Sequence, residues 1–178
     1  MSTMTTKAEE KARLLSRQLN ELKQDGKTER IVFAESCTAG LVSALVGQVP
    51  GISEFLCGSA VTCRESVKQH WLNVPSETLE TNSAESVETA NAMAVGVLAK
   101  TQEATCSAAI AGHLGPDDPS DIGGVNFVTV ATKNESGQPV AIAMGTYALQ
   151  SRSRSERQYE SAANVLEMIT DFLRGEFY

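Results

Sequence analysis

Residues 30–45, RIVFAESCTAGLVSAL, decide how the rest of the chain can be arranged. They begin with a short apolar run at 31–34, whose β-branched and aromatic residues predict a buried strand. Small or polar residues and Gly40 follow, and after them Leu41, Val42 and Leu45 recur at helical spacing. The stretch therefore predicts a strand, a tight turn and the start of a helix in close succession.

This turn carries groups that could do chemistry. Free backbone N–H groups and the positive end of the helix dipole face outward at such a turn, so an anion can bind there. Ser36, Cys37 and Thr38 present hydroxyl or thiol groups at the same place. Serine and threonine before a helix are, however, usually caps of that helix. The turn alone leaves both interpretations open.

Composition narrows the class of protein. The chain has 178 residues, 42% of them hydrophobic and 21% charged, which predicts one globular domain over 1–178 with residues 1–6 loose. The formal net charge of −7, without a basic block, argues against nucleic-acid binding. No apolar run approaches 18 residues and no signal-peptide pattern is present, so a cytoplasmic protein that does not bind membranes is expected. The four cysteines and two histidines show no zinc spacing, and no metal is expected.

Helical and strand patterns alternate through the first two-thirds of the chain, and a hairpin pattern follows. This order predicts an α/β fold, a three-layer α/β/α sandwich with a mixed, mostly parallel sheet. Residues 77–80 are expected to form a short turn, and either Ser83 or Ser86 caps the helix after it. The expected helices are 8–24, 41–46, 64–72, 86–98 and 159–173, and the expected strands are 31–34, 55–62, 106–111, 125–132 and 140–149.

Four segments, in this order, resemble the CinA C-terminal domain family, and the similarity extends over residues 8–173. That family includes nicotinamide-nucleotide amidases and has a three-layer α/β/α fold. The resemblance implies hydrolysis of the carboxamide of nicotinamide mononucleotide, or of a related nucleotide amide, to the acid and ammonia, with no metal or other cofactor. The segments are AESCTAG at 34–40, VPGISEF at 49–55, AVT at 60–62 followed by Lys68, and LNVPSETLE at 72–80.

The resemblance also implies site residues. Ser36 falls on the serine nucleophile of the family pattern and Lys68 on its lysine. Three positions depart from the pattern: Cys63 replaces a tyrosine, Ala111 replaces a loop threonine, and the acidic residues of 117–123 replace a glycine-rich segment. The candidate substrate-binding residues are Glu35, Cys37, Thr38, Gly40, Cys63, Ala111, Gly112, His113, Gly115, Arg152 and Arg154, with Arg157 as a further candidate for the phosphate-binding arginine.

Ser36 and Lys68 suit each other chemically. A serine is a poor nucleophile until a base removes its proton, and a desolvated lysine with a lowered pKa can be that base. Adjacent parallel strands would bring the two residues to one edge of the sheet. We therefore expect their side chains to lie within about 4–5 Å of each other. A solvated helix lysine is the alternative for Lys68.

Other roles stay open at this stage. Glu35 accepts a ribose hydroxyl or caps the turn, and Cys37 either packs as a small hydrophobe, which we favour, or acts as a nucleophile. His113 is a turn residue or a phosphate donor. The charges of Asp117, Asp118 and Asp121 would repel a phosphate if they faced it, and otherwise indicate a changed ligand or a solvated loop.

The departures at Cys63 and Ala111 leave a second function open. This is a catalytically impaired nucleotide-binding or regulatory protein that keeps the fold. A small-molecule nucleotide is the expected partner in both cases, and the low aromatic content leaves room for a symmetric homo-oligomer.

Overall fold

The structure is a computed structural model and describes residues 3–115 and 123–176. Its strands are β1 (Ile31–Glu35), β2 (Leu56–Val61), β3 (Cys106–His113), β4 (Val125–Lys133) and β5 (Pro139–Ala148). Its helices are α1 (Thr3–Gln24), α2 (Leu41–Gly47), the short 3₁₀ helix η1 (Ile52–Glu54), α3 (Glu65–Leu72), α4 (Ser76–Asn82), α5 (Val87–Lys100) and α6 (Arg154–Leu173).

The strands form one mixed sheet in the order β2-β1-β3-β4-β5. β1 pairs in parallel with β2 and β3, while β4 pairs antiparallel with β3 and β5, so every strand except β4 runs in the same direction. Glu35, at the end of β1, lies opposite Val61 of β2 and Ile110 of β3. The carboxyl ends of these three parallel strands therefore meet at one edge of the sheet, which is where ligands bind in such sheets.

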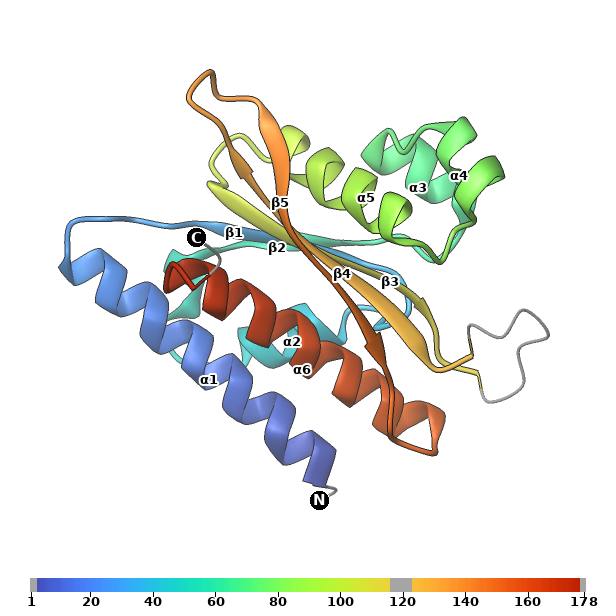
Figure 1. Ribbon diagram of the computed structural model, residues 1–178. Helices are drawn as coiled ribbons and strands as arrows, with labels where there is room; N and C mark the ends of the chain where they lie inside the picture. The colour runs from blue at the N-terminus through green and yellow to red at the C-terminus, as the bar shows by residue number, and fades with distance from the viewer. Residues whose placement is uncertain (1–2, 116–122, 177–178) are drawn as a thin grey trace.

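Helices cover both faces of the sheet (Figure 1). Ile31 and Phe33 of β1 contribute to the core beneath α1, α2 and α6, whereas Val32 and Ala34 contribute to the core beneath α3, α4 and α5. Successive side chains of a strand point to opposite faces, so an uninterrupted apolar strand belongs between two helical layers. The predicted α/β/α fold with a mixed, mostly parallel sheet is confirmed.

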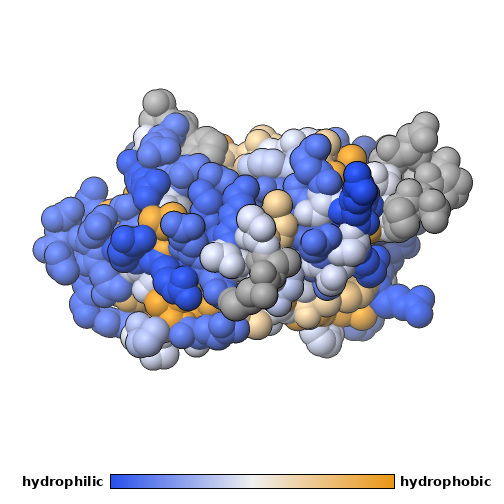
Figure 2. All heavy atoms as spheres, turned by 90° about the horizontal axis from the view of Figure 1, so that it is seen from below, coloured by the Kyte–Doolittle hydropathy of each residue, from blue (hydrophilic) through white to orange (hydrophobic). Residues whose placement is uncertain are grey.

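The outer surface is mostly hydrophilic where α1 approaches the viewer, with small separate apolar areas (Figure 2). Ala8, Ala12, Leu15 and Leu19 form the buried side of α1, which packs against α6. No helix in the described ranges combines the length and the apolar character that crossing a membrane requires.

Three local predictions need correction or a choice between alternatives. α1 begins at Thr3, so the expectation of a loose segment is wrong for residues 3–6; Met4 and Thr5 are half-buried and extend the packing of the helix. Residues 76–82 form α4 rather than a turn, because Leu79 is buried and ties the segment to the core. Ser86 caps α5, since its Oγ accepts a hydrogen bond from the backbone N–H of Thr89 at 3.1 Å.

Gly96 fixes the distance between α5 and the end of α3. A Cβ atom at this position would lie 2.0 Å from the carbonyl oxygen of Leu72, which no side chain can occupy without moving the backbone. This close approach matters for function because α3 carries Lys68.

Candidate active site

Glu35 organises the turn after β1. Its side chain is buried, and its carboxylate accepts hydrogen bonds from backbone and hydroxyl donors on both sides of the turn. The expectation that Glu35 binds a ribose hydroxyl is wrong, and the capping alternative is correct, because the protein already fills its acceptor positions. The donors, at 2.9 to 3.0 Å, are Thr38 Oγ1, the backbone N–H groups of Gly40, Val42 and Ser43, and Ser59 Oγ.

Thr38 and Gly40 therefore support the turn instead of contacting a substrate. Thr38 is 1% exposed and donates its hydroxyl to Glu35. Gly40 has a φ of 96°, a left-handed conformation that favours glycine, and its N–H also points to Glu35. The Glu35 carboxylate occupies the start of α2, so the prediction of an external anion at this helix N-terminus is wrong.

Ser36 and Lys68 form a contact that agrees with the predicted proximity. Lys68 Nζ lies 3.0 Å from Ser36 Oγ, 2.8 Å from the Thr62 carbonyl oxygen and 3.4 Å from the Cys63 carbonyl oxygen. The Lys68 side chain is fully buried, so the solvated alternative is wrong. Burial lowers the pKa of Lys68, and the carboxylate of Glu85 opposes this shift most strongly. The catalytic roles of the pair stay predictions.

Three oxygen atoms lie within hydrogen-bond distance of Lys68 Nζ, which fits an ammonium donating to all three and also a neutral amine. A neutral amine has two N–H bonds and one lone pair, and the two carbonyl oxygens can accept both N–H groups. The lone pair is then left for the hydroxyl of Ser36, which would donate its proton toward Nζ. This is the arrangement that a general base needs.

Ser36 lines a cavity of about 240 Å³, and the buried Lys68 lies behind it. Segments from five regions of the chain meet there: the turn after β1, Cys63 shortly after β2, the loop before α5, the end of β3 and the start of α6. No group of three metal-ligating side chains occurs among the described residues. The lining residues are Ser36, Cys37, Ala39, Cys63, Glu85, Gly112, His113, Leu114, Arg154 and Gln158.

The two cysteines at the cavity differ in character. Burial raises the pKa of Cys37 to about 12, and the side chain packs against the core beneath α2, which favours the packing interpretation over a nucleophile. Cys63 is exposed, and its Sγ lies 3.6 Å from the Ser36 carbonyl oxygen. Cys63 lines the cavity beside Ser36, and its role in substrate binding stays a prediction.

The segment 111–115 contributes to the cavity only in part. Gly112 and His113 line it, and a Cβ atom on Gly112 would lie 2.6 Å from the Val125 carbonyl oxygen. Ala111 is fully buried in the core beneath α5, and Gly115 also lies outside the lining. The prediction of a substrate contact is therefore wrong for both residues in the described structure. The predictions for Asp117, Asp118 and Asp121 concern positions outside the residues that the structure describes.

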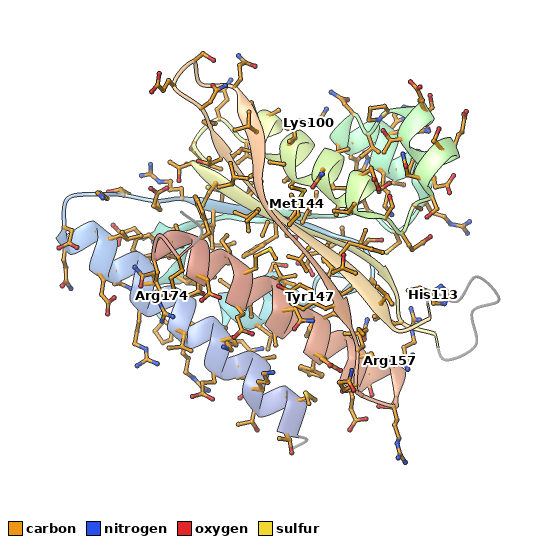
Figure 3. The ribbon with its side chains drawn as sticks, in the orientation of Figure 1. Lys100, His113, Met144, Tyr147, Arg157 and Arg174 are labelled. Carbon is orange, nitrogen blue, oxygen red and sulfur yellow. The ribbon has the colours of Figure 1, made fainter. Side chains whose placement is uncertain are left out.

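The structure separates the three arginines. Arg154 lines the cavity, whereas Arg152 lies outside the described lining, so Arg154 is the better placed of the two and the role of Arg152 stays a prediction. Arg157 lies near His113 at the same end of the molecule (Figure 3). Its guanidinium donates to the carbonyl oxygens of Ser151, Leu114 and Gly115 at 2.8, 3.2 and 2.9 Å, so Arg157 supports the walls of the cavity.

Sequence reasoning missed two polar residues of the lining. Gln158 donates from Nε2 to the Cys37 carbonyl oxygen at 3.3 Å. It follows Arg154 by four residues on α6, so the helical period could have found it. Glu85 lies between α4 and α5, and no sequence signal marks it.

Comparisons with known proteins agree with this fold. Residues 11–173 match the family model described as the CinA C-terminal domain. A CinA-like protein of Prochlorococcus marinus is 36% identical over 149 residues, which cover 82% of this chain and 33% of that protein. A CinA-like protein of Myxococcus xanthus is 40% identical over 98 residues, which cover 55% of this chain and 23% of that protein. The chain thus spans a third or less of the length of these curated relatives.

Two solved structures extend the comparison. The competence/damage inducible protein CihA from Agrobacterium tumefaciens superposes with a TM-score of 0.80 at 27% identity, covering 98% of this chain and 99% of that one. A competence-damaged protein (CinA) superfamily protein from Escherichia coli gives a TM-score of 0.79 at 22% identity, covering 97% and 93%. The second likeness concerns the fold alone.

Proposed function

Because the chain belongs to the CinA C-terminal domain family, we propose that it is an amidohydrolase in which Ser36 is the nucleophile and Lys68 the base. The substrate class is a nucleotide amide such as nicotinamide mononucleotide. The observation that carries the proposal is the 3.0 Å contact between the buried Lys68 Nζ and the Oγ of Ser36, which lines the cavity.

The reaction follows from this contact. Lys68 takes the hydroxyl proton as Ser36 Oγ forms a bond to the carboxamide carbon. The C–N bond of the resulting tetrahedral intermediate then breaks, and Lys68 returns the proton to the departing nitrogen, which leaves as ammonia. Water then attacks the acyl-serine ester while Lys68 accepts one of its protons. The bond from the acyl carbon to Ser36 Oγ breaks and Lys68 returns that proton to Oγ, which gives the carboxylic acid, free Ser36 and a neutral Lys68.

Two further groups are suited to the substrate. The backbone N–H group of Cys37, a residue that lines the cavity, donates to no other described residue, so it is suited to stabilise the oxyanion of the intermediate. Arg154, the arginine that lines the cavity, is suited to the phosphate, because a guanidinium can bind it through two parallel hydrogen bonds.

The test measures ammonia release from nicotinamide mononucleotide by the purified protein. Ser36→Ala should lower the rate by several orders of magnitude, because it removes the nucleophile. Ser43→Ala is the matched control: its hydroxyl donates to the Gly40 carbonyl oxygen and lies outside the described lining, so activity should be kept.

Two results would contradict the proposal. Near-normal ammonia release by Ser36→Ala would exclude Ser36 as the nucleophile. Nucleotide binding without ammonia release by the parent protein would favour a catalytically impaired regulatory protein. The observation that favours this second function is that Cys63 lines the cavity at the position where the family pattern has a tyrosine.

A further inference from the structure

The cavity is lined by two side chains of opposite charge that form no hydrogen bond or ion pair within the described residues, although the charge of Glu85 acts on Lys68. Arg154 and Glu85 both line it. Within the described residues, neither side chain forms a hydrogen bond or an ion pair, with each other or with a third group. Glu85 is moreover half-buried. Because the proposed reaction needs Lys68 in its neutral form, Glu85 then loses that positive neighbour, and a half-buried carboxylate in this situation is suited to a cationic ligand.

The backbone holds Glu85 in place. The neighbouring residues Ala84 and Ser86 are 7% and 8% exposed. The Glu85 N–H donates to Ser83 Oγ at 3.2 Å, and Ser86 Oγ donates to the Ser83 carbonyl oxygen at 3.2 Å. The loop before α5 is thus closed by its own hydrogen bonds, and the Glu85 side chain keeps its place in the lining.

The charge of Glu85 works against the proposed base. Its negative charge favours the protonated form of Lys68, although the reaction needs a neutral amine. A cation bound beside Glu85 would offset this field and release the lysine for its role. The cavity is therefore better matched to a ligand that brings positive charge close to the reacting carboxamide.

We propose that Glu85 binds the cationic ring of the substrate, so that the cavity selects an amide with a positive ring and a negative group that reaches Arg154. This inference rests on the proposed function. In nicotinamide mononucleotide the carboxamide is attached to a pyridinium cation, and the phosphate is at the far end of the molecule. The reduced form has the same carboxamide and phosphate on a neutral dihydropyridine ring, and would lose the contact with Glu85.

The test compares the binding of these two forms by calorimetry, with Ser36→Ala as the background so that neither is consumed. Ser36→Ala should bind the cationic form more tightly than the reduced form. Adding Glu85→Gln should lower this preference roughly ten-fold, as expected for one partly buried charge pair. Adding Glu65→Gln is the matched control and should leave the preference unchanged, because Glu65 is exposed and lines only the neighbouring cavity.

Arg154→Gln in the same background separates the two ends of the cavity. This substitution should weaken the binding of both forms by the same factor, since both forms have the phosphate. An unchanged preference in the Glu85→Gln variant would overturn the inference, and so would a failure of both forms to bind Ser36→Ala. Failure of the parent protein to release ammonia, with selective binding intact, would contradict the proposed function alone.

Discussion

Lys68 is the residue whose chemistry depends most on its surroundings. Burial lowers its pKa, and the base in the proposed reaction must be neutral. We therefore predict that kcat/KM for nicotinamide mononucleotide rises with pH through the lowered pKa of Lys68 and is constant above it. Steady-state ammonia release across a pH series measures this profile. A rate that falls with increasing pH over the same range would show that the protonated lysine is the active form.

The cysteines give a second prediction at this scale. A thiolate reacts with iodoacetamide and a thiol does not, so exposure and pKa decide the order of labelling. Cys63 is exposed, whereas burial raises the pKa of Cys37 and of Cys106. Mass spectrometry of briefly treated native protein should find the label on Cys63 before either of the others. If Cys37 were labelled first, it would again be a candidate for the nucleophile.

At the scale of residues, sequence reasoning succeeded where strand topology decides a contact and failed where the contact depends on the folded chain. Ser36 and Lys68 could be placed together because each follows one of two adjacent parallel strands, and topology alone fixes that relation. Glu35 could not be assigned, because its donor Ser59 lies 24 residues away on β2. The capping role depends on contacts that exist only in the folded chain.

At the scale of elements, the contact between α3 and α5 positions the proposed base. We predict that Gly96→Ala lowers the free energy of unfolding by about 1–3 kcal/mol, because its Cβ would meet the backbone of Leu72. Gly47→Ala is the matched control: no atom lies within 4 Å of its Cβ position, and alanine favours the helix. Urea unfolding of both variants measures the difference. Equal stabilities would mean that α5 can move away from α3 without cost.

The start of α6 and the short helix α4 show where the spacing of apolar residues no longer predicts a helix. The strong apolar pattern of α6 was recognised by steps of three and four residues, but the helix begins at Arg154, five residues before the first residue of that pattern. Its first turn is fixed by a capping box between Ser153 and Glu156. α4 was missed because its seven residues bury only Leu79, too few positions to define a helical face.

In the whole molecule, the site lies where three parallel strands end and α6 returns. Ser36 follows β1, Cys63 follows β2, and His113 ends β3. Arg154 and Gln158 reach the same cavity from α6, more than a hundred residues after Ser36. The three strand ends are predictable from the alternation of strands and helices. The contribution of α6 is not, because it depends on how far the antiparallel strands β4 and β5 carry the chain before the helix begins.

Burial of Lys68 should also be visible in the stability of the whole molecule. Its pKa is lower in the folded state than the ordinary value of about 10.4 in the unfolded chain. Below both values the proton is bound in either state, and the folded protein is penalised for a buried charge. Between them the unfolded chain binds more protons, so the free energy of unfolding rises with pH by up to about 1.4 kcal/mol per unit. The stabilisation is complete above the unfolded pKa and is lost as pH falls through the folded one.

Lys68→Met removes this titration while filling a similar volume. We predict that the stability of the parent protein, minus that of Lys68→Met, increases as pH rises from the lowered pKa of Lys68 towards its ordinary value, as measured by urea unfolding at each pH. Subtracting the variant cancels the carboxylates and the other lysines, which both proteins share. Parallel curves would mean that Lys68 keeps its ordinary pKa in the folded protein, and the lowered pKa on which its role as a base depends would be lost with it.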